Sequence, residues 1–253
     1  MSPVQPPLVD TACAPPVETM RPAIIIPVYN HHKYIGEVIA SAKDLGMPIF
    51  VVDDGSTDAT GKIIDALSGI TVLRHSSNQG KGAALLTGFA AALGQHCNWA
   101  ISLDGDSQHN PQDAHALLAA VDHCERCIVI GKRQGMQNNR NVPWTSRFGR
   151  KFSNFWVWAA GGPRVEDSQS GFRLYPLPET LHLETKARRY QFEVEILVKA
   201  QQRKLKIKEA PVQVVYQEGS ERISHFHPWR DFWRNSSTFS RLIWARIFSW
   251  FRL

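Results

Sequence analysis

The segment Ile101-Ser102-Leu103-Asp104-Gly105-Asp106-Ser107-Gln108-His109 joins an apolar run to two carboxylates. The apolar residues from Trp99 to Leu103 predict a buried strand. Residues i and i+2 of an extended chain point the same way, so Asp104 and Asp106 can face one point beyond the strand. Ligands bind at that end of strands in open α/β sheets. These oxygens and the Gln108 carbonyl suit Mg²⁺ or Mn²⁺ shared with phosphate, although Asp-Gly is also a common turn former.

Apolar runs and helical periods alternate on both sides of this segment. The strands predicted before it are residues 23–28, 49–52 and 70–73. Three helices are predicted between them. The first is 35–45 and the third is 83–93. The second can be capped by Ser56 or Thr57 and ends near Leu67. A helix at 111–122 and a strand at 128–130 follow. This alternation predicts an α/β fold with a parallel sheet.

The pattern changes after residue 131. A loop at 131–141 precedes a helix at about 144–160, a strand at 171–175, a helix at 190–203, and extended pieces at 206–209 and 212–216. The chain is therefore expected to have three parts. Residues 1–22, with six prolines, are a disordered leader; 23–219 are one domain; and 220–253 are a basic aromatic tail.

Composition narrows the classes of partner. The 253 residues carry a net charge of +6, which favours an anionic partner such as a phosphate ligand, an anionic membrane or a nucleic acid. Four cysteines are too few for a disulfide scaffold, which suggests the cytoplasm. No apolar stretch is long enough to span a membrane, and the proline-rich N-terminus is not expected to be a signal peptide.

Polar motifs follow the other predicted strands as well. Pro27-Val28-Tyr29-Asn30 follows the first, Asp53-Asp54 the second and Asn78-Gln79-Gly80-Lys81-Gly82 the third. A carboxylate after the second strand can accept hydrogen bonds from a base or ribose. The glycines around Lys81 allow close backbone approach, and the lysine offers a cation to a diphosphate. Neither GxGxxG nor a P-loop is present, which disfavours those nucleotide-binding classes.

These motifs, in this order, resemble glycosyltransferase family 2. The stretches are PVYN, VVDDGSTDAT, NQGKGAAL, SLDGDSQHNP and DSQSGFRLY, and the resemblance covers about residues 23–225. Within the family the chain is similar to the dolichol- or polyprenol-phosphate mannosyl/glucosyltransferase branch. The resemblance implies the GT-A fold, a Rossmann-like, mostly parallel sheet flanked by helices. It also implies a nucleotide-sugar donor (GDP- or UDP-hexose), Mg²⁺ or Mn²⁺ and a lipid-phosphate acceptor.

The resemblance and the motifs together assign the site residues. The nucleotide side comprises Pro27, Tyr29, Asp53, Lys81, Asp104 and Gly105. The metal ligands are Asp104, Asp106 and Gln108. The catalytic residues are Asp106, Arg133 and Arg222, with the arginines on phosphate. The acceptor side comprises Ser170, Arg173, Glu193 and His225. Glu193 and Glu195 lie two apart on a helix, so one is expected at the acceptor and the other in solvent.

The implied reaction is an inverting displacement that releases a nucleoside diphosphate. A phosphate acceptor is already an anion and needs no strong base. A hydroxyl acceptor, which stays open as an alternative, would need a carboxylate base such as Asp106 or Glu193. A further alternative is a non-catalytic module that binds a membrane or nucleic acid on the same fold.

The tail predicts where the protein works. From Arg222 to Leu253 there are six arginines, one acid and nine Phe or Trp. If 228–252 is an amphipathic helix, most arginines line one face and apolar residues the other, as in membrane-interface helices. The alternative that this helix packs on the protein's own core stays open. No nucleic-acid partner is expected. The sequence thus predicts a peripheral protein on the cytoplasmic face of an anionic membrane.

Overall fold

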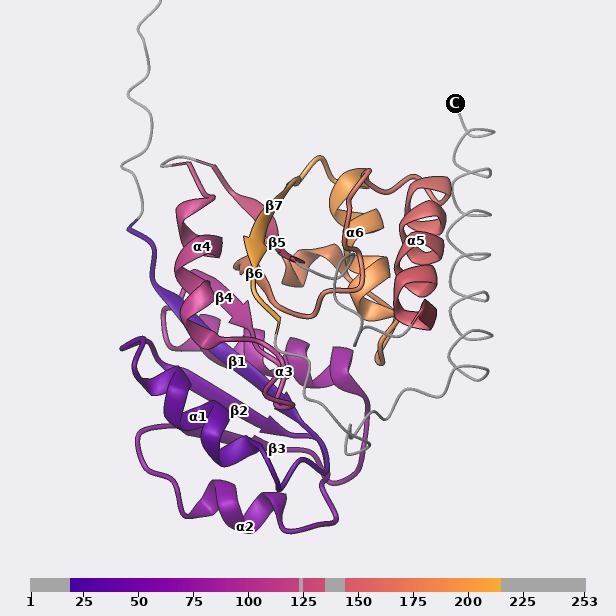
Figure 1. Ribbon diagram of the computed structural model, residues 1–253. Helices are drawn as coiled ribbons and strands as arrows, with labels where there is room; N and C mark the ends of the chain where they lie inside the picture. Colours follow the sequence, from indigo (N-terminus) through magenta and orange to yellow (C-terminus); the bar gives the residue numbers. More distant parts are fainter. Residues whose placement is uncertain (1–18, 123–124, 135–143, 215–253) are drawn as a thin grey trace, which may run out of the picture.

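The computed structural model describes residues 19–122, 125–134 and 144–214. Its seven-stranded sheet has the order β3-β2-β1-β4-β6-β5-β7 (Figure 1). The strands are β1 Pro22–Val28, β2 Ile49–Asp53, β3 Thr71–Arg74, β4 Trp99–Ser102, β5 Cys127–Arg133, β6 Arg173–Pro176 and β7 Lys206–Val212. The helices are α1 Ile35–Lys43, α2 Thr60–Asp65, α3 Lys81–Gly94, α4 Ala114–Ala119, α5 Trp144–Ala159 and α6 Phe192–Gln202. Short 3₁₀ turns occupy Pro111–Asp113 and Leu181–Leu183.

The sheet is mostly parallel, and β6 is its reversed strand. The strands β1 to β4 pair in parallel, as do β5 and β7, whereas β6 pairs antiparallel with both β4 and β5. The mostly parallel sheet that the resemblance implied is confirmed, and its reversed strand lies after residue 131, where the strand–helix alternation no longer holds. The reversal places the amino end of β6 beside the carboxyl end of β4, where Ser102 is opposite Arg173.

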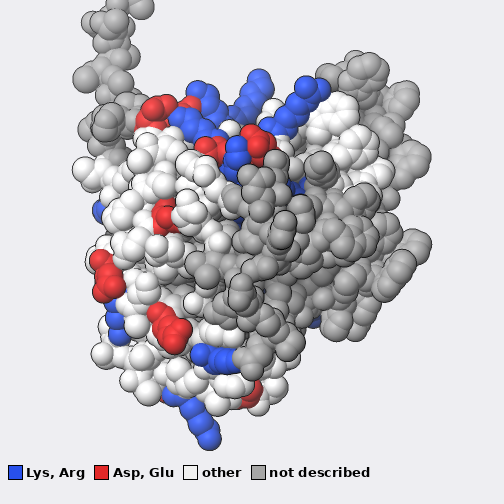
Figure 2. Space-filling view, in the orientation of Figure 1, with Lys and Arg blue, Asp and Glu red and all other residues white. Residues whose placement is uncertain are grey.

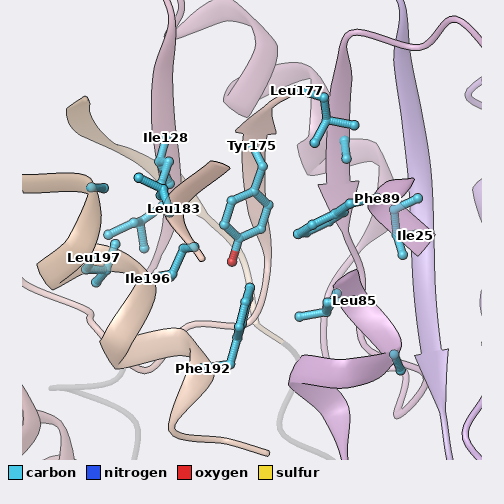
Figure 3. Packing of buried hydrophobic residues seen from close by; sticks show 14 of the residues in the cluster. Ile25, Leu85, Phe89, Ile128, Tyr175, Leu177, Leu183, Phe192, Ile196 and Leu197 are labelled. Carbon is cyan, nitrogen blue, oxygen red and sulfur yellow. The ribbon is translucent and has the colours of Figure 1, made fainter. Parts of the chain in front are cut away.

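Both faces of the sheet are buried, which explains the continuous apolar runs of its central strands. One face carries α3 and α6. There Phe89, Tyr175 and Phe192 are fully buried, with 4.9 Å between the ring centroids of Phe89 and Tyr175 (Figure 3). The opposite face carries α1, with Ile24 and Ile35 among its buried residues. Burying a side chain of this size stabilises the fold by about 1.5–3 kcal/mol.

The turn after β2 differs from its predicted role. Neither Ser56 nor Thr57 caps α2, which begins at Thr60 after Ala59 without a side-chain cap. Instead, the Ser56 hydroxyl accepts a hydrogen bond from Asn30 N at 3.0 Å, and Thr57 N donates to Asn30 Oδ1 at 2.8 Å. The turn therefore ties the loop after β1 to the loop after β2, which holds two strand ends together.

The predicted piece at 206–209 and the first residue of the piece at 212–216 belong to one strand, β7, whereas residues 215 and 216 lie outside the described residues. Pro211 is exposed, and the strand tolerates a proline there because β7 lies at the edge of the sheet. Beyond this strand, Val214 forms an isolated bridge with His109, next to the Asp104–Gln108 turn. The edge strand thereby reaches the same end of the sheet as the predicted site.

Charge on the described surface is mixed in sign. Figure 2 shows acidic and basic side chains side by side on one face of the molecule. Lys208, for example, lies between Asp122, at 2.7 Å, and Glu125. Among the described helices, none combines the length and the apolar character that crossing a membrane requires. Residues 1–18 of the predicted leader and the whole predicted tail, 220–253, lie outside the described residues.

Candidate active site

The Asp104–Gly105–Asp106 turn lies directly beyond β4, at the edge where the parallel strands end. Leu103 is buried and anchors the turn, and the Asp104 side chain is 25% exposed. Asp106 Oδ1 accepts a hydrogen bond from Gln108 N at 3.1 Å, which tightens the turn. The turn and the predicted paired carboxylates are therefore the same feature, and the two interpretations of this segment are compatible.

Lys81 lies between two carboxylates. Its Nζ donates a hydrogen bond to Glu193 Oε1 at 2.6 Å and pairs with Asp104 Oδ1 at 2.6 Å. Gly171 borders this group closely, since a Cβ built there would contact Lys81 Nζ and lie 3.0 Å from Glu193 Oε1. We call Lys81, Asp104 and Glu193 the Lys81 cluster. It joins residues that the sequence assigned separately to the nucleotide and to the acceptor.

The charges in this turn influence one another. Burial raises the pKa of Asp104, but the charge and hydrogen bond of Lys81 outweigh it and hold that pKa below its ordinary value. Burial and the neighbouring charge of Asp104 raise the pKa of Asp106. Burial lowers the pKa of Lys81, yet Asp104 and Glu193 raise it further than burial lowers it. One lysine therefore leaves an excess of negative charge in the turn, which favours binding of a further cation.

A second carboxylate fixes the loop that presents Lys81. Asp54 accepts hydrogen bonds from Gln79 N at 2.9 Å and Gly80 N at 2.7 Å. His75 holds Asp54 through Nδ1 at 2.6 Å, and its Nε2 lies 3.0 Å from the Thr87 hydroxyl. Gly80 has φ +104°, a conformation in which a side chain would be strained. The sequence analysis noted Asp54 only as part of the Asp53-Asp54 pair and did not predict this role for it, and it missed His75.

The predicted base and ribose residues lie at the ends of β1 and β2. Pro27 is buried and Tyr29 is half-buried. Asp53 is 5% exposed, and its Oδ1 accepts a hydrogen bond from Ser56 N at 2.9 Å while Arg74 Nε lies 3.7 Å from Oδ2. Its carboxylate thus shapes the turn, and its contact with a nucleotide stays a prediction.

Arg173 is the clearest departure from the predicted site. Its side chain is 0% exposed and donates hydrogen bonds to the backbone carbonyls of Ser170, Glu193 and Ser168 at 2.7, 2.8 and 2.7 Å. A guanidinium held in this way cannot reach an acceptor without breaking these bonds. In the described structure Arg173 is therefore a brace between the 168–170 segment and α6 rather than an acceptor contact.

Ser170 and Glu193, the other acceptor-side residues that the structure describes, are buried. Ser170 is 0% exposed, and its hydroxyl has no hydrogen-bond partner among the described residues. Glu193 is 7% exposed and belongs to the Lys81 cluster. The expectation that one of the two glutamates is solvated is wrong, because Glu195 is 1% exposed. Its Oε2 accepts hydrogen bonds from Lys186 N at 3.1 Å and Ala187 N at 2.6 Å, which fixes the loop before α6.

Arg133 lies at the end of β5 and forms a two-pronged ion pair. Its Nε and Nη2 donate to Asp167 Oδ2 and Oδ1 at 2.7 and 2.8 Å, and the Asp167 side chain is 0% exposed. Burial raises the pKa of Asp167, but Arg133 lowers it below its ordinary value. The pair orients the guanidinium at the strand end; its contact with phosphate stays a prediction.

His109 is a further site neighbour that sequence reasoning missed. Its ring is buried and stacks on Phe172, with 5.2 Å between the ring centroids, and its Nδ1 has no hydrogen-bond partner within the part of the chain that the structure describes. Burial lowers the pKa of His109 to about 4, although the charge of Asp104 opposes the shift. The ring is therefore neutral near neutral pH and adds no positive charge to the turn.

The residues of the turn fit a metal site in which a phosphate supplies some of the ligands, rather than one built from protein ligands alone. Within residues 19–122, 125–134 and 144–214, no three His, Cys, Asp or Glu residues are grouped to hold a metal. Asp104 and Asp106 offer two carboxylates, the charge of Asp104 raises the pKa of Asp106, and Gln108 is half-buried beside them. Such a set suits a divalent cation that takes its other ligands from a phosphate. The predicted residues Arg222 and His225 lie outside the described residues.

Comparisons with known proteins agree with this architecture. The family model "Glycosyl transferase family 2" matches residues 23–177. The UDP-N-acetylglucosamine–dolichyl-phosphate N-acetylglucosaminyltransferase of Methanococcus voltae is 30% identical over 217 residues, covering 78% of this chain and 86% of the relative. The polyprenol monophosphomannose synthase of Mycolicibacterium smegmatis is 32% identical over 165 residues, covering 62% of each chain.

A solved structure supports the fold. Glucosyl-3-phosphoglycerate synthase from Mycobacterium tuberculosis, crystallised with Mn²⁺ and UDP-glucose, aligns with a TM-score of 0.62 at 20% identity. The alignment covers 80% of this chain and 73% of that enzyme. The mostly parallel sheet of the present chain, with its flanking helices, is the GT-A architecture that the resemblance implied. The chain is therefore a glycosyltransferase that belongs to glycosyltransferase family 2 and is related to its dolichol- and polyprenol-phosphate branch.

Proposed function

We propose that this glycosyltransferase moves a hexose from a GDP- or UDP-linked donor to a polyprenyl phosphate in a membrane, with inversion at the anomeric carbon. The observation that carries the proposal is the Asp104–Gly105–Asp106 turn at the carboxyl end of β4, with excess negative charge beside Lys81. The names of the two relatives, which specify dolichyl-phosphate and polyprenol acceptors, favour a lipid phosphate over a glycan hydroxyl.

The donor would lie across the carboxyl ends of β1, β2 and β4. Pro27, Tyr29 and Asp53 would contact its base and ribose. Asp104, Asp106 and Gln108 would hold Mg²⁺ or Mn²⁺, which would neutralise charge on the donor diphosphate. Lys81 does not need to contact the diphosphate in this arrangement, because its ammonium already has two carboxylate partners.

The acceptor would enter from the side of Ser170 and Glu193. Its phosphate oxygen would attack the anomeric carbon while the bond to the nucleoside diphosphate breaks on the opposite face, which inverts the configuration. The acceptor is an anion near neutral pH and needs no general base. Arg133 and Arg222 would stabilise the charge that grows on the leaving group or position the acceptor.

The protein would work as a peripheral enzyme on the cytoplasmic face of a membrane. A polyprenyl phosphate keeps its hydrocarbon chain in the bilayer and its phosphate at the surface. The arginines and aromatic residues of 228–253 supply the two interactions that interfacial attachment requires.

A donor screen tests the proposal. The purified chain would be incubated with GDP-mannose, UDP-glucose and UDP-N-acetylglucosamine, with polyprenyl phosphate in anionic vesicles, and with Mg²⁺, Mn²⁺ or EDTA. We expect one donor to yield a product that extracts into organic solvent only when a divalent metal is present. Equal turnover in EDTA would contradict the metal assignment, and turnover that ignores the polyprenyl phosphate would contradict the acceptor assignment.

A further inference from the structure

Lys81 is shared by carboxylates from two different parts of the proposed site. Asp104 belongs to the turn that would hold the metal, and Glu193 belongs to α6 on the acceptor side. Both lie 2.6 Å from Lys81 Nζ, and the exposed fractions of the Lys81, Asp104 and Glu193 side chains are 14%, 25% and 10%. A single ammonium thus serves two largely buried anions, so the loss of either one changes how firmly the ammonium holds the other.

Backbone segments lie close to the Lys81 ammonium and to the residue that carries it. A Cβ at Gly171 would contact Lys81 Nζ and lie 2.5 Å from Asp104 Oδ2, so the backbone of β6's leading segment borders the cluster on that side. The backbone next to Lys81 is fixed by the hydrogen bond from Gly80 N to Asp54. Asp104, Glu193 and the backbone at Gly171 therefore all border the Lys81 ammonium.

We propose that Lys81 is a positioning residue, and that Glu193 sets how strongly its ammonium competes with a divalent cation for Asp104. The inference rests on the proposed metal site. When Asp104 turns toward a cation, the ammonium keeps Glu193 as its partner. Without the Glu193 charge, freeing Asp104 would leave a largely buried ammonium unpaired, which is costly. Glu193 thus favours metal binding although it is not itself a metal ligand.

The proposal gives a specific pattern of binding. Glu193→Gln should weaken Mn²⁺ binding about tenfold, because Lys81 then holds Asp104 more tightly. Lys81→Met removes the competing ammonium, so Mn²⁺ should bind at least as tightly as to the wild type. In the Lys81→Met background, adding Glu193→Gln should change the Mn²⁺ dissociation constant by less than about twofold.

Two other roles predict different patterns. If Glu193 attracted the metal directly by its charge, the effect of Glu193→Gln would persist in the Lys81→Met background. If Lys81 held the diphosphate, Lys81→Met would weaken UDP or GDP binding measured without metal, and Glu193→Gln would not. The cycle of single and double variants therefore separates positioning by Lys81 from both alternatives.

The experiment uses the full chain and needs no lipid acceptor. Mn²⁺ would be titrated into each variant with saturating UDP, and separately GDP, while the electron paramagnetic resonance signal of free Mn²⁺ is recorded. Lys208→Met is the matched control, because Lys208 also pairs with two carboxylates but lies on β7 beside Asp122 and Glu125. It should leave the Mn²⁺ dissociation constant unchanged. Urea unfolding of each variant checks that the comparison is between folded proteins.

The outcomes are separable from those of the proposed function. An undiminished effect of Glu193→Gln in the Lys81→Met background, or no effect in the wild-type background, would overturn the inference. Absence of Mn²⁺ binding with both nucleotides would overturn it as well. Failure of the proposed function would instead appear as no transfer in the donor screen. If Glu193→Gln does not fold, Glu193→Asp can replace it. Its shorter side chain holds the carboxylate farther from Lys81, so the Mn²⁺ dissociation constant should rise by a smaller factor.

Discussion

Replacement of Arg173 by methionine should destabilise the fold rather than weaken one substrate contact. The change removes the donors of three charge-assisted hydrogen bonds, to the carbonyls of Ser170, Glu193 and Ser168. Each buried carbonyl left without a partner costs about 1–3 kcal/mol. Methionine also removes a buried cation whose desolvation opposes folding, which offsets part of that sum. We therefore expect a loss of about 3–5 kcal/mol in the free energy of unfolding.

Urea unfolding followed by circular dichroism measures this loss. The midpoint should fall while the slope stays constant, and the melting temperature should drop by about 10 °C. The stability of Arg173→Lys should lie between that of the wild type and that of Arg173→Met. Lysine keeps the charge, but its ammonium cannot reproduce the planar fork of guanidinium donors. Arg203→Met, at an exposed position after α6, is the control and should change stability by less than about 0.5 kcal/mol. A methionine variant as stable as the wild type, with only a raised KM for the acceptor, would refute the structural role.

Three further changes test other parts of the structure. Asp167→Asn should lower the free energy of unfolding by about 2–4 kcal/mol at pH 7, because it removes the buried charge of the carboxylate that accepts two hydrogen bonds from the Arg133 guanidinium. Since the folded state lowers the pKa of Asp167 from 3.8, the difference from the wild type should shrink as the pH falls below about 4; a pH-independent difference would contradict the pair. Gly171→Ala should displace the Lys81 cluster and reduce transfer at least tenfold with a smaller effect on urea unfolding, whereas wild-type turnover would show that the cluster tolerates a Cβ there. Deleting 228–253 should release the protein from anionic vesicles at low salt in co-sedimentation, and a truncated chain that still sediments would show that the tail is not the anchor.

The fold could be predicted because its signals are local. The apolar runs at β1, β2 and β4 and the polar turns that follow them are visible within short windows of sequence. The direction of β6 was not visible, because it depends on how the chain returns after α5 rather than on the composition of the strand. The Asp104–Gly105–Asp106 turn was recognisable for the same reason as the strands, since its spacing is local.

The partners of the charged residues could not be predicted, because they come from distant parts of the chain. Lys81 and Glu193 are 112 residues apart in sequence. Arg173 and Glu195 are charged residues within mainly apolar stretches, and both are buried and satisfied by backbone groups. Nothing in the sequence distinguishes a buried arginine that braces carbonyls from an exposed one that awaits a phosphate. Only the folded structure shows which carbonyls it reaches.

The most direct test of the central claim is the transfer activity of Asp106→Ala. The wild type and the variant would be compared for metal-dependent transfer of labelled hexose to polyprenyl phosphate in anionic vesicles, at saturating Mg²⁺ or Mn²⁺. Asp44→Ala, at an exposed position after α1, serves as the control. If the Asp106 carboxylate holds the metal at the donor diphosphate, the variant should remain folded and lose transfer, while the control keeps it. Retention of more than about a tenth of wild-type activity, a loss of less than ~1.4 kcal/mol in transition-state stabilisation, would contradict that role.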